Sequence, residues 1–241
     1  MQIRPSRSLR SITDASGESW LLIGGNDHET GKSSSPTEAH YNTLETFGRS
    51  WYGLEEVDYH WSAQDMMTLD QVPYIGQMTA SSPHVYVGTG FNKWGMAMGA
   101  LAASLVTDLI LEKSNNYQEL FNPLRSKLKT KDLQQFTKKN TSVAKDFVAT
   151  KAQRPQRTAD DLKIDEGALV SINGKKAGAY RDPHGDLHVV QSTCTHLGCG
   201  LRWNDAERSW DCACHGSRFS YTGEVLNGPA TKPLKQLKAD E

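Results

Sequence analysis

Cysteine is scarce in this sequence, long apolar runs are missing, and charge of neither sign predominates. The 241 residues include 4 cysteines, 27 Lys and Arg and 28 Asp and Glu, which gives a formal net charge of −1. A general nucleic-acid binder is usually basic overall, so we expect no nucleic-acid partner.

No segment has the composition of a secretory signal or a membrane span. The first residues are basic, but no apolar stretch follows them. The best candidate for a span, residues 94–113, is interrupted by Asp108, and its apolar part is shorter than the roughly 20 residues that cross a bilayer. We therefore expect a buried helix there, no membrane span and a cytoplasmic location.

Charge and periodicity divide the chain into three parts. Residues 1–117 carry 7 basic and 13 acidic side chains, residues 118–157 carry 10 and 3, and residues 158–241 carry 10 and 12. The first part has strand patterns at 19–25 and 82–91 and helix patterns at 35–52 and 95–113, whereas the last has short strand-like runs between turn residues. We predict an α+β protein, with a mixed region over 1–117, a basic, partly helical linker over 118–157 and a small all-β domain over 158–241.

All four cysteines lie in two short motifs. Residues 194–199 read CTHLGC and residues 212–217 read CACHGS. Between them 15 residues separate His196 from Cys212, enough for a pair of strands to bring the chain back. The two motifs offer six soft or borderline donors to a metal: Cys194, His196, Cys199, Cys212, Cys214 and His215.

Three kinds of site fit these donors. Two structural disulfides would leave both histidines unexplained, and disulfides are uncommon in the cytosol. A structural zinc site usually combines closely spaced cysteine pairs, whereas each half here offers both Cys and His. In a Rieske [2Fe–2S] centre, two cysteines hold one iron and two histidines hold the other, as the pattern Cys-x-His…Cys-x-x-His requires. The mixed donor set favours this third interpretation.

Residues 160–238 resemble the Rieske iron–sulfur proteins of respiratory and photosynthetic chains. The resemblance implies that Cys194, His196, Cys212 and His215 are the cluster ligands. It also implies a disulfide between Cys199 and Cys214, a Ser217 hydroxyl that donates to a cluster sulfide, and a third, proline-containing loop at Gly-Pro-Ala 228–230.

The same resemblance bears on the redox potential. Neutral imidazole ligands leave less negative charge on the cluster than thiolates do, so potentials lie at about −150 to +300 mV rather than about −400 mV. High-potential members of the family carry a tyrosine at the position of Phe219, which has no hydroxyl to donate to a ligand cysteine. We expect a potential in the lower or middle part of the range unless Tyr221 compensates.

The first part of the chain resembles the C-terminal part of FAD-dependent oxidoreductases of the D-amino-acid oxidase and glycine oxidase superfamily. The resemblance rests on residues 59–76, with Asp70, Pro73, Ile75 and Gly76, and on a strand, glycine turn and helix at 85–99. A helix N-terminus favours negative charge. The family places this turn against the flavin, which implies FAD contacts at Gly88, Gly90, Phe91, Asn92, Lys93, Trp94, Gly95 and Met96.

A G-x-G-x-x-G motif, which holds the pyrophosphate in that family, does not occur in this sequence. We therefore expect the chain to lack the dinucleotide-binding half, and FAD to belong to the full-length form. The resemblance implies an oxidoreductase in which a Rieske cluster passes electrons between a flavin, which oxidises an amine or amino-acid-like substrate, and a redox partner. The alternative is a non-catalytic Rieske electron-transfer module that binds no FAD. A ring-hydroxylating oxygenase is disfavoured, because no 2-His-1-carboxylate iron site follows the last motif.

Overall fold

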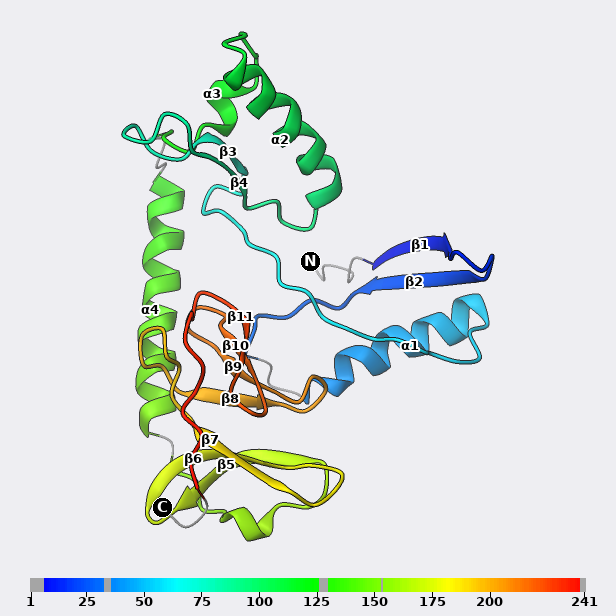
Figure 1. The fold of residues 1–241 in the computed structure, drawn as a ribbon, viewed down its shortest axis with the longest axis vertical. Helices are drawn as coiled ribbons and strands as arrows, with labels where there is room; N and C mark the ends of the chain where they lie inside the picture. Colours follow the sequence, from blue (N-terminus) through cyan, green and yellow to red (C-terminus); the bar gives the residue numbers. More distant parts are fainter. Residues whose placement is uncertain (1–6, 33–35, 126–129, 153, 239–241) are drawn as a thin grey trace. The chain divides into compact units, whose positions relative to one another are not determined.

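The computed structural model describes residues 7–32, 36–125, 130–152 and 154–238, and Figure 1 shows its elements. The chain forms two compact units. Met1–Trp61 and Val143–Glu241 make up the first unit, and Ser62–Ser142 make up the second. Among the described residues, none of the helices combines the length and apolar content that crossing a bilayer requires.

The second unit contains a small antiparallel sheet and an apolar helix. Strand β3 (Tyr74–Gln77) pairs with β4 (Tyr86–Thr89), after which come α2 (Gly95–Ile110) and the short α3 (Gln118–Phe121). Its core consists of Ile75, Leu105 and Phe121. The helix expected at 95–113 therefore forms, but it is not fully buried. Only Leu105 of α2 is buried, and one face of the helix, from Met96 to Ile110, remains exposed.

An ion pair fixes the segment before β3. Arg125 donates to both carboxylate oxygens of Asp70, at 2.9 Å each, and also to the carbonyls of Val72 and Pro73. The Arg125 guanidinium, helped by the Val72 N–H and the Thr68 hydroxyl, lowers the pKa of Asp70 to about 2. Asp70 and Pro73, two residues of the predicted family motif, are thus held by the chain that follows α3.

The first unit begins with a β-hairpin and a helix. Strand β1 (Arg7–Thr13) pairs with β2 (Ser19–Gly25), and α1 (Glu38–Tyr52) follows. The hairpin turn is built on Asp14, whose carboxylate accepts bonds from the N–H groups of Ser16 and Glu18. Gly53 ends α1 in the left-handed conformation that glycine adopts without strain.

A long helix, α4 (Thr130–Ala152), occupies much of the predicted linker and leads to the 3₁₀ turn η1 (Ala159–Asp161). From Val143 onward it belongs to the first unit. The domain boundaries predicted from composition stay a prediction.

The C-terminal part is all-β, as predicted, and is built from two antiparallel sheets. One sheet has the order β5-β6-β7, and the other has the order β11-β10-β9-β8. Their bounds are β5 Glu166–Ile172, β6 Lys175–Arg181, β7 Leu187–Gln191, β8 Leu201–Asn204, β9 Ser209–Cys212, β10 Arg218–Ser220 and β11 Val225–Asn227. The fully buried Trp210 packs on Gly178, where a Cβ would lie 2.9 Å from its ring. This second sheet carries the loops of the candidate site.

Candidate metal centre

The two cysteine motifs form loops with the same backbone hydrogen bonds. In the first loop, Cys194 N–H donates to the Cys199 carbonyl at 2.8 Å and Gly198 N–H donates to the Cys194 carbonyl at 3.0 Å. In the second, Cys212 N–H donates to the Ser217 carbonyl at 2.8 Å and Gly216 N–H donates to the Cys212 carbonyl at 2.9 Å. The loops are therefore two copies of one turn.

Each turn depends on a glycine four residues after its first cysteine. Gly198 and Gly216 have φ of 74° and 78°, a conformation that other residues adopt only with strain. The C-x-x-x-G spacing that the two motifs share is present in the sequence, but it was not part of the prediction. It would have identified Gly198 and Gly216 as residues that shape the site.

The structure brings the four predicted ligands together from these two loops. Cys194 and Cys212 are buried, with 3% and 0% of their surface exposed, and neither is in a disulfide. His196 and His215 are exposed, and their ring centroids lie 5.0 Å apart with the rings nearly perpendicular. Two buried thiols and two solvent-exposed imidazoles are the ligand set of a [2Fe–2S] cluster in which two cysteines hold one iron and two histidines hold the other.

The cysteine sulfurs are surrounded by hydrogen-bond donors. Contact with Cys212 and bonds from the backbone N–H groups of His196 and Leu197 lower the pKa of Cys194. The N–H groups of His215 and Cys214 point at Cys212, but contact with Cys194 and burial raise the pKa of this second thiol. The pair therefore loses one proton readily and the second with difficulty. Positive charge from a metal would offset the repulsion between two thiolates.

The environment of His215 favours the neutral form of its imidazole. Burial and the neighbouring His196 ring lower the pKa of His215. A neutral imidazole is the form that coordinates a metal, so this environment suits a ligand.

Cys199 and Cys214 form the disulfide that the resemblance implied, with their Cα atoms 6.5 Å apart. Their sulfurs and that of Cys212 lie within 4.8 Å of one another. Since two of these three sulfurs are bonded to each other, only Cys212 of this group has a thiolate to offer a metal.

Ser217 joins the second loop to the third. Its fully buried hydroxyl accepts a bond from Ala230 N–H at 3.0 Å and lies against Cys194, whose pKa it helps to lower. The Gly228–Ala230 segment is thereby tied to the ligand loops. Phe219 is also fully buried and packs in the cluster of side chains that contains Cys194 and Cys212. Tyr221 instead packs its ring against Tyr180 and His188.

A buried ion pair supports the base of the second loop. Arg218 and Asp211, 6% and 3% exposed, flank residues 212–217 and interact at 3.2 Å, and Asn204 donates to the same carboxylate at 2.8 Å. Sequence reasoning missed this pair, although its two members directly border the motif.

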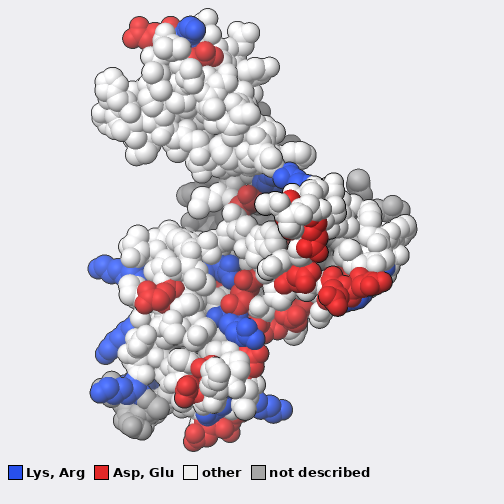
Figure 2. All heavy atoms as spheres, turned by 45° about the vertical axis from the view of Figure 1, so that its right-hand side comes forward, with Lys and Arg blue, Asp and Glu red and all other residues white. Residues whose placement is uncertain are grey.

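The eight residues predicted to contact FAD form one continuous turn of the second unit. Gly90 has φ of 77° and packs so closely on Thr68 that a Cβ would lie 2.5 Å from its methyl group. Asn92 and Lys93 also have positive φ, and Phe91 packs on the core of this unit. Helix α2 begins without a side-chain cap, and Trp94 and Met96 are 67% and 73% exposed. On the face shown in Figure 2, the part of the chain that contains β3, β4 and α2 is largely uncharged, apart from charged side chains gathered near its ends.

This turn therefore fits one edge of a flavin. Its N-terminal N–H groups favour negative charge, and its exposed apolar side chains suit a ring system. Gly88, in β4, also faces this region of the unit, where a Cβ would lie 3.4 Å from Phe91. A glycine-rich phosphate loop for the rest of FAD does not occur in the sequence.

Comparison with known proteins gives two family matches. Residues 154–238 match the Rieske [2Fe-2S] domain, and residues 3–109 match the FAD dependent oxidoreductases. The resemblances and the fold class predicted from the sequence are thereby confirmed. The first domain implies a [2Fe-2S] cluster, and the second implies FAD.

Individual relatives agree with these matches. YhfW of Bacillus subtilis (strain 168), named as a Rieske 2Fe-2S iron-sulfur protein, is 45% identical over 98% of this chain and 46% of its own length. The cytochrome b6-f complex iron-sulfur subunit of Chlorobaculum thiosulfatiphilum is 36% identical over 38% of this chain and 46% of its own length. The chain thus spans about half the length of these relatives. A solved plasma-membrane Rieske protein, PetC3 of Synechocystis PCC 6803, is 32% identical over 29% of this chain and 72% of its own length, with a TM-score of 0.27.

Proposed function

We propose that this chain, which joins a segment of an FAD dependent oxidoreductase domain to a Rieske [2Fe-2S] domain, carries electrons between a flavin and a redox partner. The cluster would be held by Cys194, His196, Cys212 and His215. It would supply one-electron transfer at a potential set by two neutral and two anionic ligands. The convergence of these four side chains from two matching loops is the observation that carries the proposal.

Contact between the two family segments supports an intramolecular route. Gly31, from the oxidoreductase segment, lies against the backbone of Ala213, between two cysteines of the second loop. A Cβ on Gly31 would be 2.7 Å from the Ala213 nitrogen. The oxidoreductase segment is thus in van der Waals contact with the second cluster loop at Gly31, and Gly31 and this loop belong to the same unit.

Polar contacts hold the same segment on the Rieske domain. Thr37 N–H donates to the Asp205 carboxylate at 2.9 Å, and its hydroxyl donates to Asn204 at 2.6 Å. The Tyr41 hydroxyl donates to Glu207. These bonds fix the start of α1 against the turn between β8 and β9, which leads into the second cluster loop.

Three residues of the two cluster loops are open to solvent. His196, Leu197 and His215 are exposed, with Leu197 at 61%. An exposed apolar side chain next to a solvent-facing predicted ligand suits contact with a redox partner. Relatives named as subunits of the cytochrome b6-f complex support a partner of this kind. A cytoplasmic location and the absence of a nucleic-acid partner stay predictions.

For the flavin side, we propose that the turn from Gly88 to Met96 contacts the isoalloxazine ring, and that the substrate is an amine or amino acid. The uncapped start of α2 would stabilise negative charge on the ring. The family match over residues 3–109 supports this assignment.

A second candidate function is a Rieske electron-transfer module that binds no flavin. The absence of a G-x-G-x-x-G motif from the sequence favours it. The two candidates differ in what they predict for FAD.

Anaerobic mixing of the cluster-loaded chain with FAD distinguishes them. Equilibrium dialysis measures whether FAD binds, and stopped-flow absorbance follows the cluster after the flavin is photoreduced. Flavin-linked transfer predicts bound FAD and a rate of cluster reduction that becomes independent of FAD concentration. A rate that stays proportional to FAD concentration, without bound FAD, identifies the module.

A further inference from the structure

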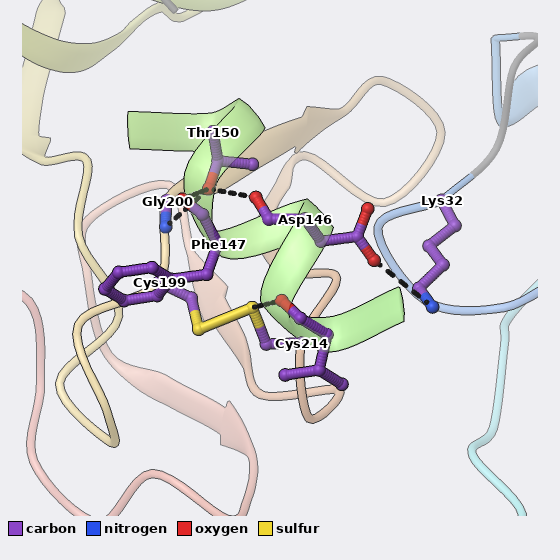
Figure 3. Close-up of a disulfide and its surroundings, with 8 residues drawn as sticks. Lys32, Asp146, Phe147, Thr150, Cys199, Gly200 and Cys214 are labelled. Carbon is purple, nitrogen blue, oxygen red and sulfur yellow. Dashed lines mark hydrogen bonds and ion pairs between the residues drawn. A yellow bond between two sulfur atoms is a disulfide. The ribbon is translucent and has the colours of Figure 1, made fainter. Parts of the chain in front are cut away.

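The C-terminal half of α4 lies over the Cys199–Cys214 disulfide, as Figure 3 shows. The Val143 carbonyl oxygen is 4.0 Å from Cys214 Sγ, and the Val143 side chain packs on the core that contains all four cysteines. A disulfide sulfur has no proton to donate, so this is a packing contact. Helix α4 precedes the residues that match the Rieske domain, so this chain supplies the cover from outside that domain.

One bond joins the helix directly to the first cluster loop. Gly200 N–H, next to Cys199, donates to the Thr150 hydroxyl at 3.2 Å in a buried environment. The same hydroxyl donates to the Asp146 carbonyl at 2.7 Å within the helix. Thr150 is 2% exposed, and a Cβ on Gly200 would lie 2.6 Å from it. The helix and the loop are therefore in direct contact, and no side chain larger than that of glycine fits at position 200.

Two further contacts fix the helix in this position. Lys176 of β6 donates its ammonium to the Thr150 carbonyl. On the other side, Lys32 pairs with the Asp146 carboxylate at 3.3 Å, which ties the helix to the segment that contacts Ala213. Two lysine side chains and one backbone N–H group, from three parts of the first unit, thus converge on one turn of α4.

The position of this cover bears on the access of thiols to the disulfide. A thiolate reduces a disulfide by attacking one of its sulfurs directly, so the rate depends on access to that sulfur. Cys199 and Cys214 are 2% and 8% exposed. We propose that α4 shields the Cys199–Cys214 disulfide from thiols, and that Thr150 is the positioning residue that holds the helix on the loop. The proposal depends on the disulfide and not on the flavin part of the proposed function.

The test compares disulfide reduction in variants of the cluster-loaded chain. Dithiothreitol is oxidised to its cyclic disulfide, while the bridge takes up two electrons and two protons and becomes two thiols. Alkylation and mass spectrometry then measure free Cys199 and Cys214 with time. Thr150→Val keeps the shape but removes the acceptor, and we expect reduction at least tenfold faster than in the unsubstituted chain. Thr150→Ser keeps the hydroxyl and should restore the slow rate.

A matched control lies on the same helix. The exposed Thr141 makes the same bond inside α4, to the Thr137 carbonyl, so Thr141→Val measures the effect of losing that bond alone. It should reduce at the unsubstituted rate. The EPR signal of the dithionite-reduced cluster gives a second readout, which should broaden in Thr150→Val and sharpen again in Thr150→Ser.

Lys32→Ala provides a decision that does not depend on Thr150→Val folding. This substitution removes the Lys32–Asp146 ion pair without changing the helix or the cluster loops, and we expect the disulfide to be reduced at least threefold faster. If Thr150→Val does not fold, this variant decides alone, and an unsubstituted rate overturns the proposal. Unsubstituted rates in both variants overturn it as well, as does equal acceleration by Thr150→Val and Thr141→Val.

Discussion

Gly31 and Ala213 are in backbone contact, although 182 positions of the sequence separate them. Gly31 lies in the segment that matches the FAD dependent oxidoreductases, and Ala213 lies between Cys212 and Cys214. The φ of 68° at Gly31 and the short distance from Gly31 to Ala213 both require glycine at position 31. The contact shows how a part of one family's domain meets the metal-binding loop of another.

Substituting Gly31 tests whether this contact supports electron transfer. In Gly31→Ala the new Cβ meets the Ala213 backbone, so the segment must move away from the loop. We expect flavin-to-cluster transfer at least tenfold slower in stopped-flow absorbance, with the EPR signal unchanged. Gly17→Ala is the matched control, since Gly17 also has positive φ but nothing within 4 Å of a Cβ. Equal rates in the two variants would remove the contact from the route.

Phe219 gives a prediction about the cluster potential. It is fully buried beside the ligand cysteines, and Phe219→Tyr adds a hydroxyl that can donate to a ligand sulfur. Such a bond stabilises the more negative, reduced cluster, so one hydrogen bond of about 1 kcal/mol should raise the midpoint potential by about 40 mV. Tyr221→Phe should leave the potential unchanged, because the Tyr221 ring packs on Tyr180 and His188. A redox titration in which only the Tyr221 variant shifts contradicts this assignment.

Ser217 predicts a shift in the other direction. Its hydroxyl lies against Cys194 and also accepts the Ala230 N–H bond. Ser217→Ala removes a donor to the reduced cluster, so we expect the midpoint potential to fall by roughly 40 mV. It should also lower the thermal midpoint, because the buried Ala230 N–H loses its acceptor. Ser220→Ala, in the strand β10 that follows this loop, is the control. A potential in Ser217→Ala that matches this control would mean that the hydroxyl does not act on the cluster.

The Asp70–Arg125 pair predicts a pH dependence of the second unit. The pKa of Asp70 is lowered from 3.8 to about 2 in the folded chain, chiefly by Arg125. The folded state therefore binds this proton less tightly than the unfolded state. The pair stabilises the fold above pH 4, and this contribution is lost as the pH falls from about 4 to about 2.

Asp70→Asn should remove that contribution. We expect the urea midpoint of the second unit to be lower at pH 7 than in the unsubstituted chain, and to fall less between pH 5 and pH 3. Hydrogen exchange of the amides of that unit measures both changes. Asp108→Asn is the control, since Asp108 bonds an asparagine rather than an arginine. The same slope in all three proteins would show that Asp70 is not the responsible group.

The candidate metal centre could be read from the sequence because its chemistry depends on residue types at short spacings, and the assignment of its four ligands stays a prediction. Cys194, His196, Cys212 and His215 are recognisable in two hexapeptides, and family knowledge added the Cys199–Cys214 pairing. The all-β nature of the last part followed from short strand patterns and turn residues.

Other features depend on contacts between residues far apart in the chain, which a single sequence does not reveal. Nothing near Gly31 or Thr150 indicates that these residues reach the cluster loops. Helix α4 was expected only as part of a polar linker, because its side chains show no broad apolar face, yet Val143 and Thr150 pack on the disulfide region. The prediction that α2 is buried was wrong along one face of the helix. An apolar sequence predicts burial, but it does not show whether another surface covers each face.

EPR spectroscopy of the dithionite-reduced chain tests the central claim most directly. We predict a rhombic signal with the low average g value of mixed histidine and cysteine ligation. His196→Ala or His215→Ala should abolish it, whereas His184→Ala, which changes an exposed histidine outside the motifs, should leave it intact. A chain that contains zinc and no iron, or a signal that survives both ligand substitutions, would contradict the account.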